Sequence, residues 1–181
     1  MPDVDLRYPI GKVADQPFSK DGFSATLKEG YLLEIQQCPI LLEQAITNLD
    51  EQQLNVPYRD GGWTVKQVVH HVADSHMNAF MRFKLALTED NPTIKTYDEA
   101  AWAELSDTKN LPVNISLTLL HALHARWYEL LKNLTGADWQ KTIFHPEHKR
   151  QITLWELLKI YAWHSKHHVA HVTSLRERKG W

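Results

Sequence analysis

Several features that define common protein classes are scarce or absent in this sequence of 181 residues. Its single cysteine, Cys38, excludes an internal disulfide framework and a cysteine-based zinc cluster. No stretch reaches the ~18 apolar residues of a membrane span, and the first residues lack the basic and apolar regions of a signal peptide. Lys and Arg (20) do not outnumber Asp and Glu (22), which argues against nucleic-acid binding driven by net charge. We therefore expect a cytoplasmic protein without nucleic-acid or membrane partners.

Glycine and proline are also few, with 7 and 8 residues, and three of the prolines fall in the first 20 positions. This clustering predicts an irregular N-terminal arm over residues 1–20. Its apolar side chains predict that the arm packs on the rest of the protein: Leu6, Tyr8, Ile10 and Phe18. The chain length suits one domain, so we expect residues 1–181 to form a single unit with its own core.

The dominant hydrophobic pattern has the period of an α-helix. It predicts four long helices, over residues 24–49, 65–87, 116–134 and 154–179, with a kink or break at Pro39. A short extra helix is expected over 98–105, and residues 142–151 predict a small hairpin or loop. Together these elements predict an all-α four-helix bundle.

Two of the predicted helices carry sequence signals for their first residue. Thr64 with Gln67, and Thr153 with Glu156, match the capping box, in which the two side chains satisfy each other's backbone N–H groups. Gly180 is a typical stop after the last helix. These signals locate the start of the second helix and both ends of the last one.

What the sequence has in excess is histidine, with 11 residues, and imidazole is the commonest metal-binding side chain. The last helix carries four of them, which form two pairs at i,i+4 spacing: His164 with His168, and His167 with His171. A helical wheel places His164 and His168 at the edge of the apolar stripe and the other pair farther toward solvent. The His164/His168 pair is therefore the better candidate for binding a metal inside a bundle.

A metal site usually needs a third protein ligand, which the second helix offers as His70, His71 or His76. The wheel alone selects His76 as the residue that faces inward. The combination of this helix with the His164/His168 spacing favours a metal site over unconnected structural histidines. The wheel and the spacing assign no role to the histidines elsewhere in the chain. His121 and His124 are expected on a helix surface, and His145 and His148 in a loop.

Three sequence blocks carry a resemblance to a known family. Residues 5–11, residues 57–78 and the block Trp163–His171 resemble the YfiT-type metal-dependent hydrolases of the DinB-like superfamily, which are metal-binding four-helix bundles. The resemblance implies one divalent metal ion per subunit, zinc or nickel, bound by His71, His164 and His168. It also implies a homodimer. For the second helix it selects His71 where the wheel selects His76, and we follow the resemblance.

Two enzymatic functions and one binding function are compatible with such a site. The first is a hydrolase that activates water on a small substrate; the second is a thiol S-transferase that uses a low-molecular-weight thiol such as bacillithiol. A non-catalytic metal-binding protein is the third. The sequence has no H-E-x-x-H motif to supply a glutamate base, so Asp74, three residues after His71, is the candidate to orient a ligand or accept a proton.

Overall fold

The computed structural model describes residues 5–16 and 22–181. Its four long helices are α1 (Ala25–Ile46), α3 (Val65–Thr88), α6 (Val113–Lys132) and α7 (Leu154–Lys179). The shorter elements are η1 (Val13–Asp15), α2 (Glu51–Leu54), α4 (Glu99–Trp102), α5 (Ser106–Asn110), η3 (Asp138–Gln140), β1 (Thr142–His145) and β2 (Arg150–Thr153). The predicted all-α four-helix bundle is confirmed. Within the described residues, no helix combines the length and apolarity needed to cross a membrane.

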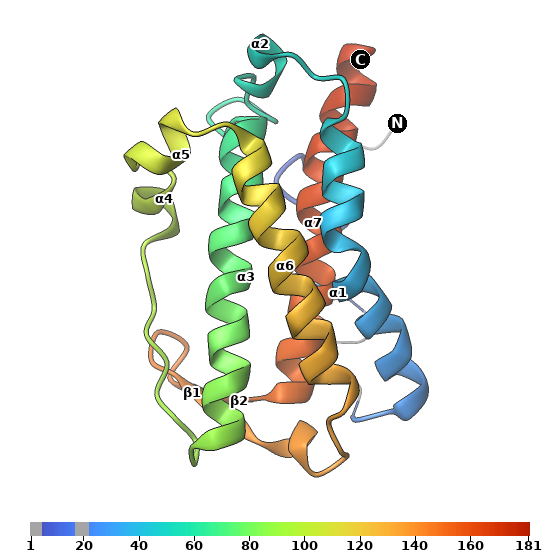
Figure 1. The fold of residues 1–181 in the computed structure, drawn as a ribbon, viewed down its shortest axis with the longest axis vertical. Helices are drawn as coiled ribbons and strands as arrows, with labels where there is room; N and C mark the ends of the chain where they lie inside the picture. The colour runs from blue at the N-terminus through green and yellow to red at the C-terminus, as the bar shows by residue number, and fades with distance from the viewer. Residues whose placement is uncertain (1–4, 17–21) are drawn as a thin grey trace.

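The order of the helices in space differs from their order in the chain. Both α1 and α3 pack against α6 and α7. The connection after α3 carries α4 and α5 back to the end where α3 begins, so α6 runs in the same direction as α3 (Figure 1). The helix α7 then runs opposite to α3. This arrangement makes α3 and α7, which are far apart in the sequence, direct neighbours.

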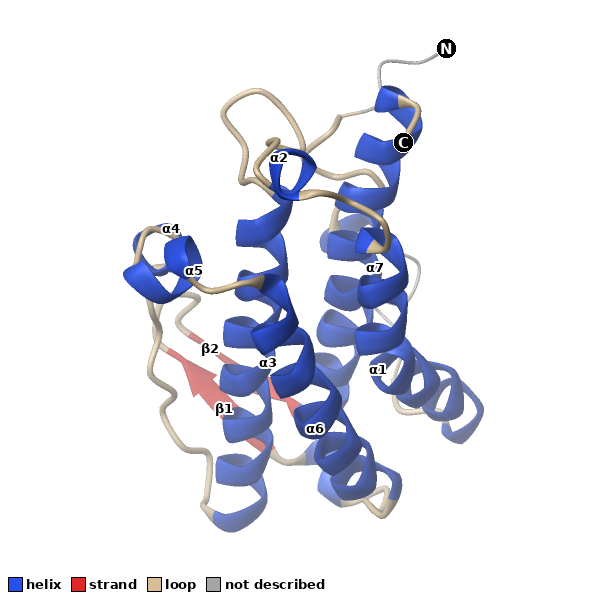
Figure 2. Ribbon diagram, turned by 45° about the horizontal axis from the view of Figure 1, so that its top comes forward, coloured by secondary structure: helices blue, strands red, loops and turns tan. Residues whose placement is uncertain are grey.

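The predicted hairpin is confirmed as a two-stranded antiparallel sheet, which follows α6 and precedes α7 in the chain and lies beside α3 (Figure 2). Its register pairs Thr142 with Thr153 and Ile143 with Ile152, and both isoleucines are buried. The short helix expected over 98–105 is α4, and a second one, α5, follows it. The sequence did not predict α2 or α5.

The start of α3 has the predicted capping box. The backbone N–H of Gln67 donates to Thr64 Oγ1 (3.1 Å), and that of Thr64 donates to Gln67 Oε1 (3.0 Å). At α7 only half of the box forms, because Thr153 accepts from the N–H of Glu156 while the Glu156 carboxylate binds Arg150 (2.7 Å). Gly180 ends α7 in the left-handed conformation, with φ 68°, as its position predicted.

The predicted break at Pro39 does not occur, since α1 continues through this residue to Ile46. Proline lacks the N–H that would bond to the carbonyl four residues earlier, that of Ile35. His124 Nδ1 on α6 lies 2.5 Å from this carbonyl oxygen and takes the place of the missing donor. A neighbouring helix thus compensates for the proline.

The predicted N-terminal arm is described in part. Residues 1–4 and 17–20, including Phe18, lie outside the described residues. The described part contacts α7: His171 Nε2 lies 3.1 Å from the carbonyl oxygen of Arg7, and the Tyr8 ring lies 6.0 Å from that of His167. Residues 5–16 therefore contact the bundle through α7.

The core consists of two apolar clusters. One surrounds Trp127 and Trp139 near the hairpin, and the other surrounds Leu42 and Val69 toward the opposite end. Along α3 and α7, the stretches between the two clusters contain buried histidines, His76 on α3 and those from His164 to His171 on α7, while His70 and His71 lie among residues of the second cluster. The fold therefore buries a layer of imidazoles between two apolar regions.

Candidate metal centre

Three histidines meet where α3 packs against α7. His71 comes from α3, and His164 and His168 lie one turn apart on α7; one ring nitrogen from each lies within 4.8 Å of the other two. The Nε2 atoms of His164 and His168 are 3.1 Å apart. A tetrahedral ion with bonds of about 2.1 Å would separate two such nitrogens by about 3.4 Å. The α7 pair therefore has the spacing, and the three histidines have the chemistry, of a site for one divalent cation.

Burial keeps these three rings neutral, which is the form that binds a metal. Desolvation, with a smaller effect from His171, lowers the pKa of His71 to about 4. Burial also lowers the pKa values of His164 and His168 well below their usual range, and the neighbouring histidines add to this effect. At pH 7 the site thus presents nitrogen lone pairs and no positive charge.

Two pockets reach this group from the surface. One, of about 320 Å³, is lined by all three histidines together with aromatic residues that include Trp63 and Trp163. The other, of about 550 Å³, is lined by His164, Arg82 and His145. Glu99 lines both of them. A carboxylate and a guanidinium are thus available beside the three histidines.

Comparison with known proteins decides the family. A family model described as the DinB superfamily matches residues 34–172, which is most of the chain. The chain belongs to the DinB superfamily. This result agrees with the resemblance seen in the sequence.

Relatives of this DinB-superfamily chain match it over nearly its whole length. YfiT from Bacillus subtilis is 47% identical over 181 residues, covering 100% of this chain and 99% of its own. A relative from Bacillus mycoides is 53% identical over 178 residues, covering 98% and 99%. The solved structure of YfiT aligns with a TM-score of 0.93 and 48% identity over 98% of this chain and 99% of that one. It is described as a probable metal-dependent hydrolase with an unusual four-helix bundle topology.

His76, which the wheel selected, is fully buried in this DinB-superfamily bundle but lies outside the group of three. Its Nε2 is 3.0 Å from His164 Nδ1, and its Nδ1 is 2.8 Å from His124 Nε2. The wheel was therefore right about burial, while the resemblance named the residue that joins the α7 pair. A wheel of α3 alone misses His71, whose ring lies 4.8 Å from that of His168 on α7.

Asp74, the predicted carboxylate, is not part of the histidine group. Burial and the charge of Asp107 in α5 raise the pKa of its carboxyl to about 6. No described hydrogen bond joins its carboxylate to any of the three histidines. The carboxylate that lines both pockets is that of Glu99, in α4. The sequence did not indicate this residue, because only the folded path of the connection between α3 and α6 brings α4 to the site.

Three further histidines that were expected toward solvent or on a helix surface are buried. His124 is 1% exposed, His167 7% and His171 3%. A wheel describes one helix at a time, whereas α1 covers His124 and the N-terminal arm covers the other two. His121, which was expected on the same helix surface as His124, is exposed and pairs with Glu43 at 3.0 Å.

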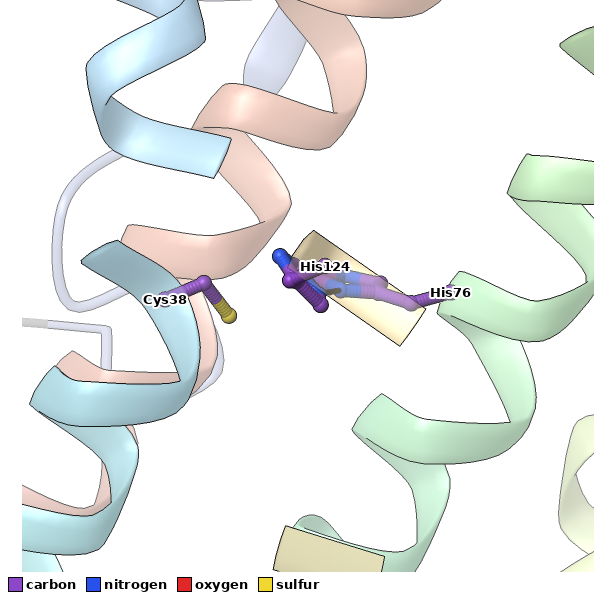
Figure 3. A group of neighbouring side chains, drawn as sticks. All are labelled: Cys38, His76 and His124. Atoms are coloured by element: carbon purple, nitrogen blue, oxygen red, sulfur yellow. Dashed lines mark hydrogen bonds between the residues drawn. The ribbon is translucent and has the colours of Figure 1, made fainter. Parts of the chain in front are cut away.

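A second cluster of potential ligands lies deeper in the bundle. The sulfur of Cys38 on α1 lies near His124 and His76 (Figure 3). Burial raises the pKa of the Cys38 thiol to about 12, so the sulfur stays protonated at neutral pH. The facing nitrogens of the two histidines already bond to each other at 2.8 Å. We therefore interpret this cluster as a hydrogen-bonded part of the core.

We expect the metal-free protein to lose stability as the pH falls from 7 to 5. Burial lowers the pKa of His124 to about 4, from 6.5. Between these values the unfolded chain binds a proton that the folded chain does not, so acidification favours unfolding by about 1.4 kcal/mol per pH unit. His124 alone contributes a loss of about 2 kcal/mol at pH 5. Urea unfolding in the presence of a chelator measures this change.

The His124→Gln variant is the control for that measurement. It cannot take up the proton, so its stability should decrease less between pH 7 and pH 5, by about 2 kcal/mol. An equal pH dependence in the variant and the unaltered protein would contradict a neutral, buried His124.

Proposed function

We propose that this protein is a metal-dependent hydrolase acting on a small substrate, with one divalent ion held by His71, His164 and His168. The observation that carries the proposal is the convergence of three neutral imidazoles at a pocket that also contains Glu99. Three protein ligands with a position left for water are typical of catalytic zinc sites. Imidazole suits zinc and nickel alike, and we favour zinc. The names of the relatives support the same class of activity.

The metal and the protein have separate tasks in this proposal. A divalent ion held by His71, His164 and His168 would supply the Lewis acidity that makes water a nucleophile at neutral pH. Glu99 accepts the proton that the attacking water loses. Desolvation in the pocket raises the pKa of Glu99, which makes its carboxylate a better proton acceptor.

The substrate occupies the larger pocket, beside His164. Its volume of about 550 Å³ suits a small molecule. Arg82, which donates to the Tyr161 hydroxyl at 3.0 Å, lines this pocket and can bind an oxygen of the substrate.

The position of Glu99 favours hydrolysis over thiol transfer. Water needs a base to remove its proton as it attacks, whereas a thiol binds a metal as the thiolate and needs none during attack. Cys38 cannot supply a thiol from the chain itself because it is buried in the core. The homodimer implied by the resemblance remains a prediction beside this proposal.

The decisive experiment compares hydrolysis and thiol transfer on the same preparation. Metal is first removed with a chelator, and zinc or nickel is then restored. We expect metal to restore hydrolysis within a panel of small esters and amides, with no requirement for added thiol. Turnover of monochlorobimane that depends on added bacillithiol, without hydrolysis, would instead identify the transferase. Inactivity in both assays would leave a metal-binding protein.

A further inference from the structure

Each of the two ligands on α7 contacts another histidine through its second ring nitrogen. We propose that His76, His124 and His171 are positioning residues that set the tautomers of His164 and His168 and leave both Nε2 lone pairs free for the metal. The proposal rests on the metal site described above and is independent of the reaction that the site catalyses. It follows from two hydrogen-bond chains, each of which ends on a backbone carbonyl.

The first chain begins at the carbonyl oxygen of Ile35, which lacks its helical donor because residue 39 is proline. His124 Nδ1 lies 2.5 Å from this oxygen. A carbonyl oxygen only accepts hydrogen bonds, so Nδ1 of His124 must carry the hydrogen. The ring is 1% exposed and contacts no carboxylate in the described hydrogen bonds, so it is neutral and its Nε2 is an acceptor.

The direction of this first bond then determines the next two. His76 Nδ1 lies 2.8 Å from the acceptor nitrogen of His124 and must donate to it (Figure 3). The neutral His76 is left with an acceptor at Nε2, which lies 3.0 Å from His164 Nδ1. His164 therefore carries its hydrogen on Nδ1. Its Nε2, the atom that faces His168, has a free lone pair.

The second chain is shorter and begins in the N-terminal arm. The carbonyl oxygen of Arg7 accepts from His171 Nε2 at 3.1 Å. His171 Nδ1 is then an acceptor and lies 3.4 Å from His168 Nδ1, which donates to it. His168 is thereby left with a free lone pair on Nε2. Each hydrogen-bond chain thus leaves a free lone pair on Nε2 of the ligand that it reaches.

The two free lone pairs face each other at 3.1 Å. Two acceptors at this distance repel each other, and a cation between them removes the repulsion. Because each chain ends on a backbone carbonyl, neither ligand can change tautomer without breaking a buried hydrogen bond. The apoprotein is therefore already arranged for a cation, and the arm is part of the metal site.

Nitrogen-15 NMR of the imidazole rings tests the tautomers directly, since Nδ1–H and Nε2–H forms have different shifts. In the metal-free protein we expect Nδ1–H for His76, His124, His164 and His168, and Nε2–H for His171. In the zinc form, His76, His124 and His171 should keep these tautomers. An Nε2–H form of His76 or an Nδ1–H form of His171 would overturn the proposal. Neither of these NMR results depends on an enzymatic activity.

Two substitutions at His124 test the effect on metal binding. His124→Leu removes the acceptor for His76, so zinc affinity should fall by about 10- to 100-fold, as for other partners of metal-binding histidines. His124→Gln keeps an acceptor oxygen near the position of Nε2 and should bind zinc nearly as tightly as the unaltered protein. His121→Leu, on the same helix but exposed, is the matched control and should show no change. Equal affinities in the two His124 variants, with the fold verified by circular dichroism, would refute the role of His124.

Discussion

Protein carrying His71→Ala should be purified without stoichiometric metal. His71 is the member of the three-histidine group that comes from α3, so its loss leaves a two-histidine pair on α7. Changes to the partners of metal ligands already cost about 10- to 100-fold in affinity, and loss of a ligand should cost more. Elemental analysis of protein purified without added metal measures the effect, and full metal content in the variant would show that His71 is not a ligand.

The neighbouring His70 is the matched control for this substitution. His70 is also buried on α3, but it bonds to Ser116 (2.7 Å) and lies outside the group of three. The His70→Gln variant should therefore keep its metal. Circular dichroism on both variants separates loss of a ligand from loss of the fold.

The second large effect is expected for Glu99→Gln, which should lower kcat/KM for hydrolysis by about 10²- to 10⁴-fold, the usual contribution of a general base. The amide keeps the shape of the side chain but cannot accept the proton of the attacking water. Metal content should be unchanged, because Glu99 is not in the histidine group. Steady-state kinetics and elemental analysis on the same sample measure the two quantities.

Two variants of other carboxylates test whether the loss of activity is specific to Glu99. Asp74→Asn removes the base that the sequence suggested, and Glu104→Gln removes an exposed carboxylate that pairs with Lys109 at 2.8 Å. Both should retain nearly full activity. If Asp74→Asn loses activity while Glu99→Gln keeps it, the base has been assigned to the wrong residue.

The sequence predicted best those features that depend on interactions between residues close together in the chain. The apolar period predicted four long helices, and the Thr64/Gln67 box predicted the residue at which α3 begins. The pairing of His164 with His168 followed from their i,i+4 spacing. Each of these features depends on residues within one or two turns of a helix, so no knowledge of the packing was needed.

The predictions that failed were those that depended on which other segments of the chain pack against a helix. His124 and His171 were placed toward solvent, yet α1 and the N-terminal arm bury them. Pro39 was expected to break α1, but a donor from α6 satisfies the carbonyl that the proline leaves free. Asp74 seemed near the ligands by spacing, whereas the carboxylate that lines the pockets is Glu99, from the connection between α3 and α6.

The excess of histidine indicated a metal, and the i,i+4 spacing together with the helical wheel selected His164 and His168 as the chelating pair on the last helix. Tertiary structure decided the rest, because it makes α3 the neighbour of α7 and brings His71 to that pair. It also gave His76, His124 and His171 partners that lie 48, 88 and 164 positions away in the chain. The spacing of a helix restricts near neighbours, whereas contacts over such separations exist only once the bundle has packed.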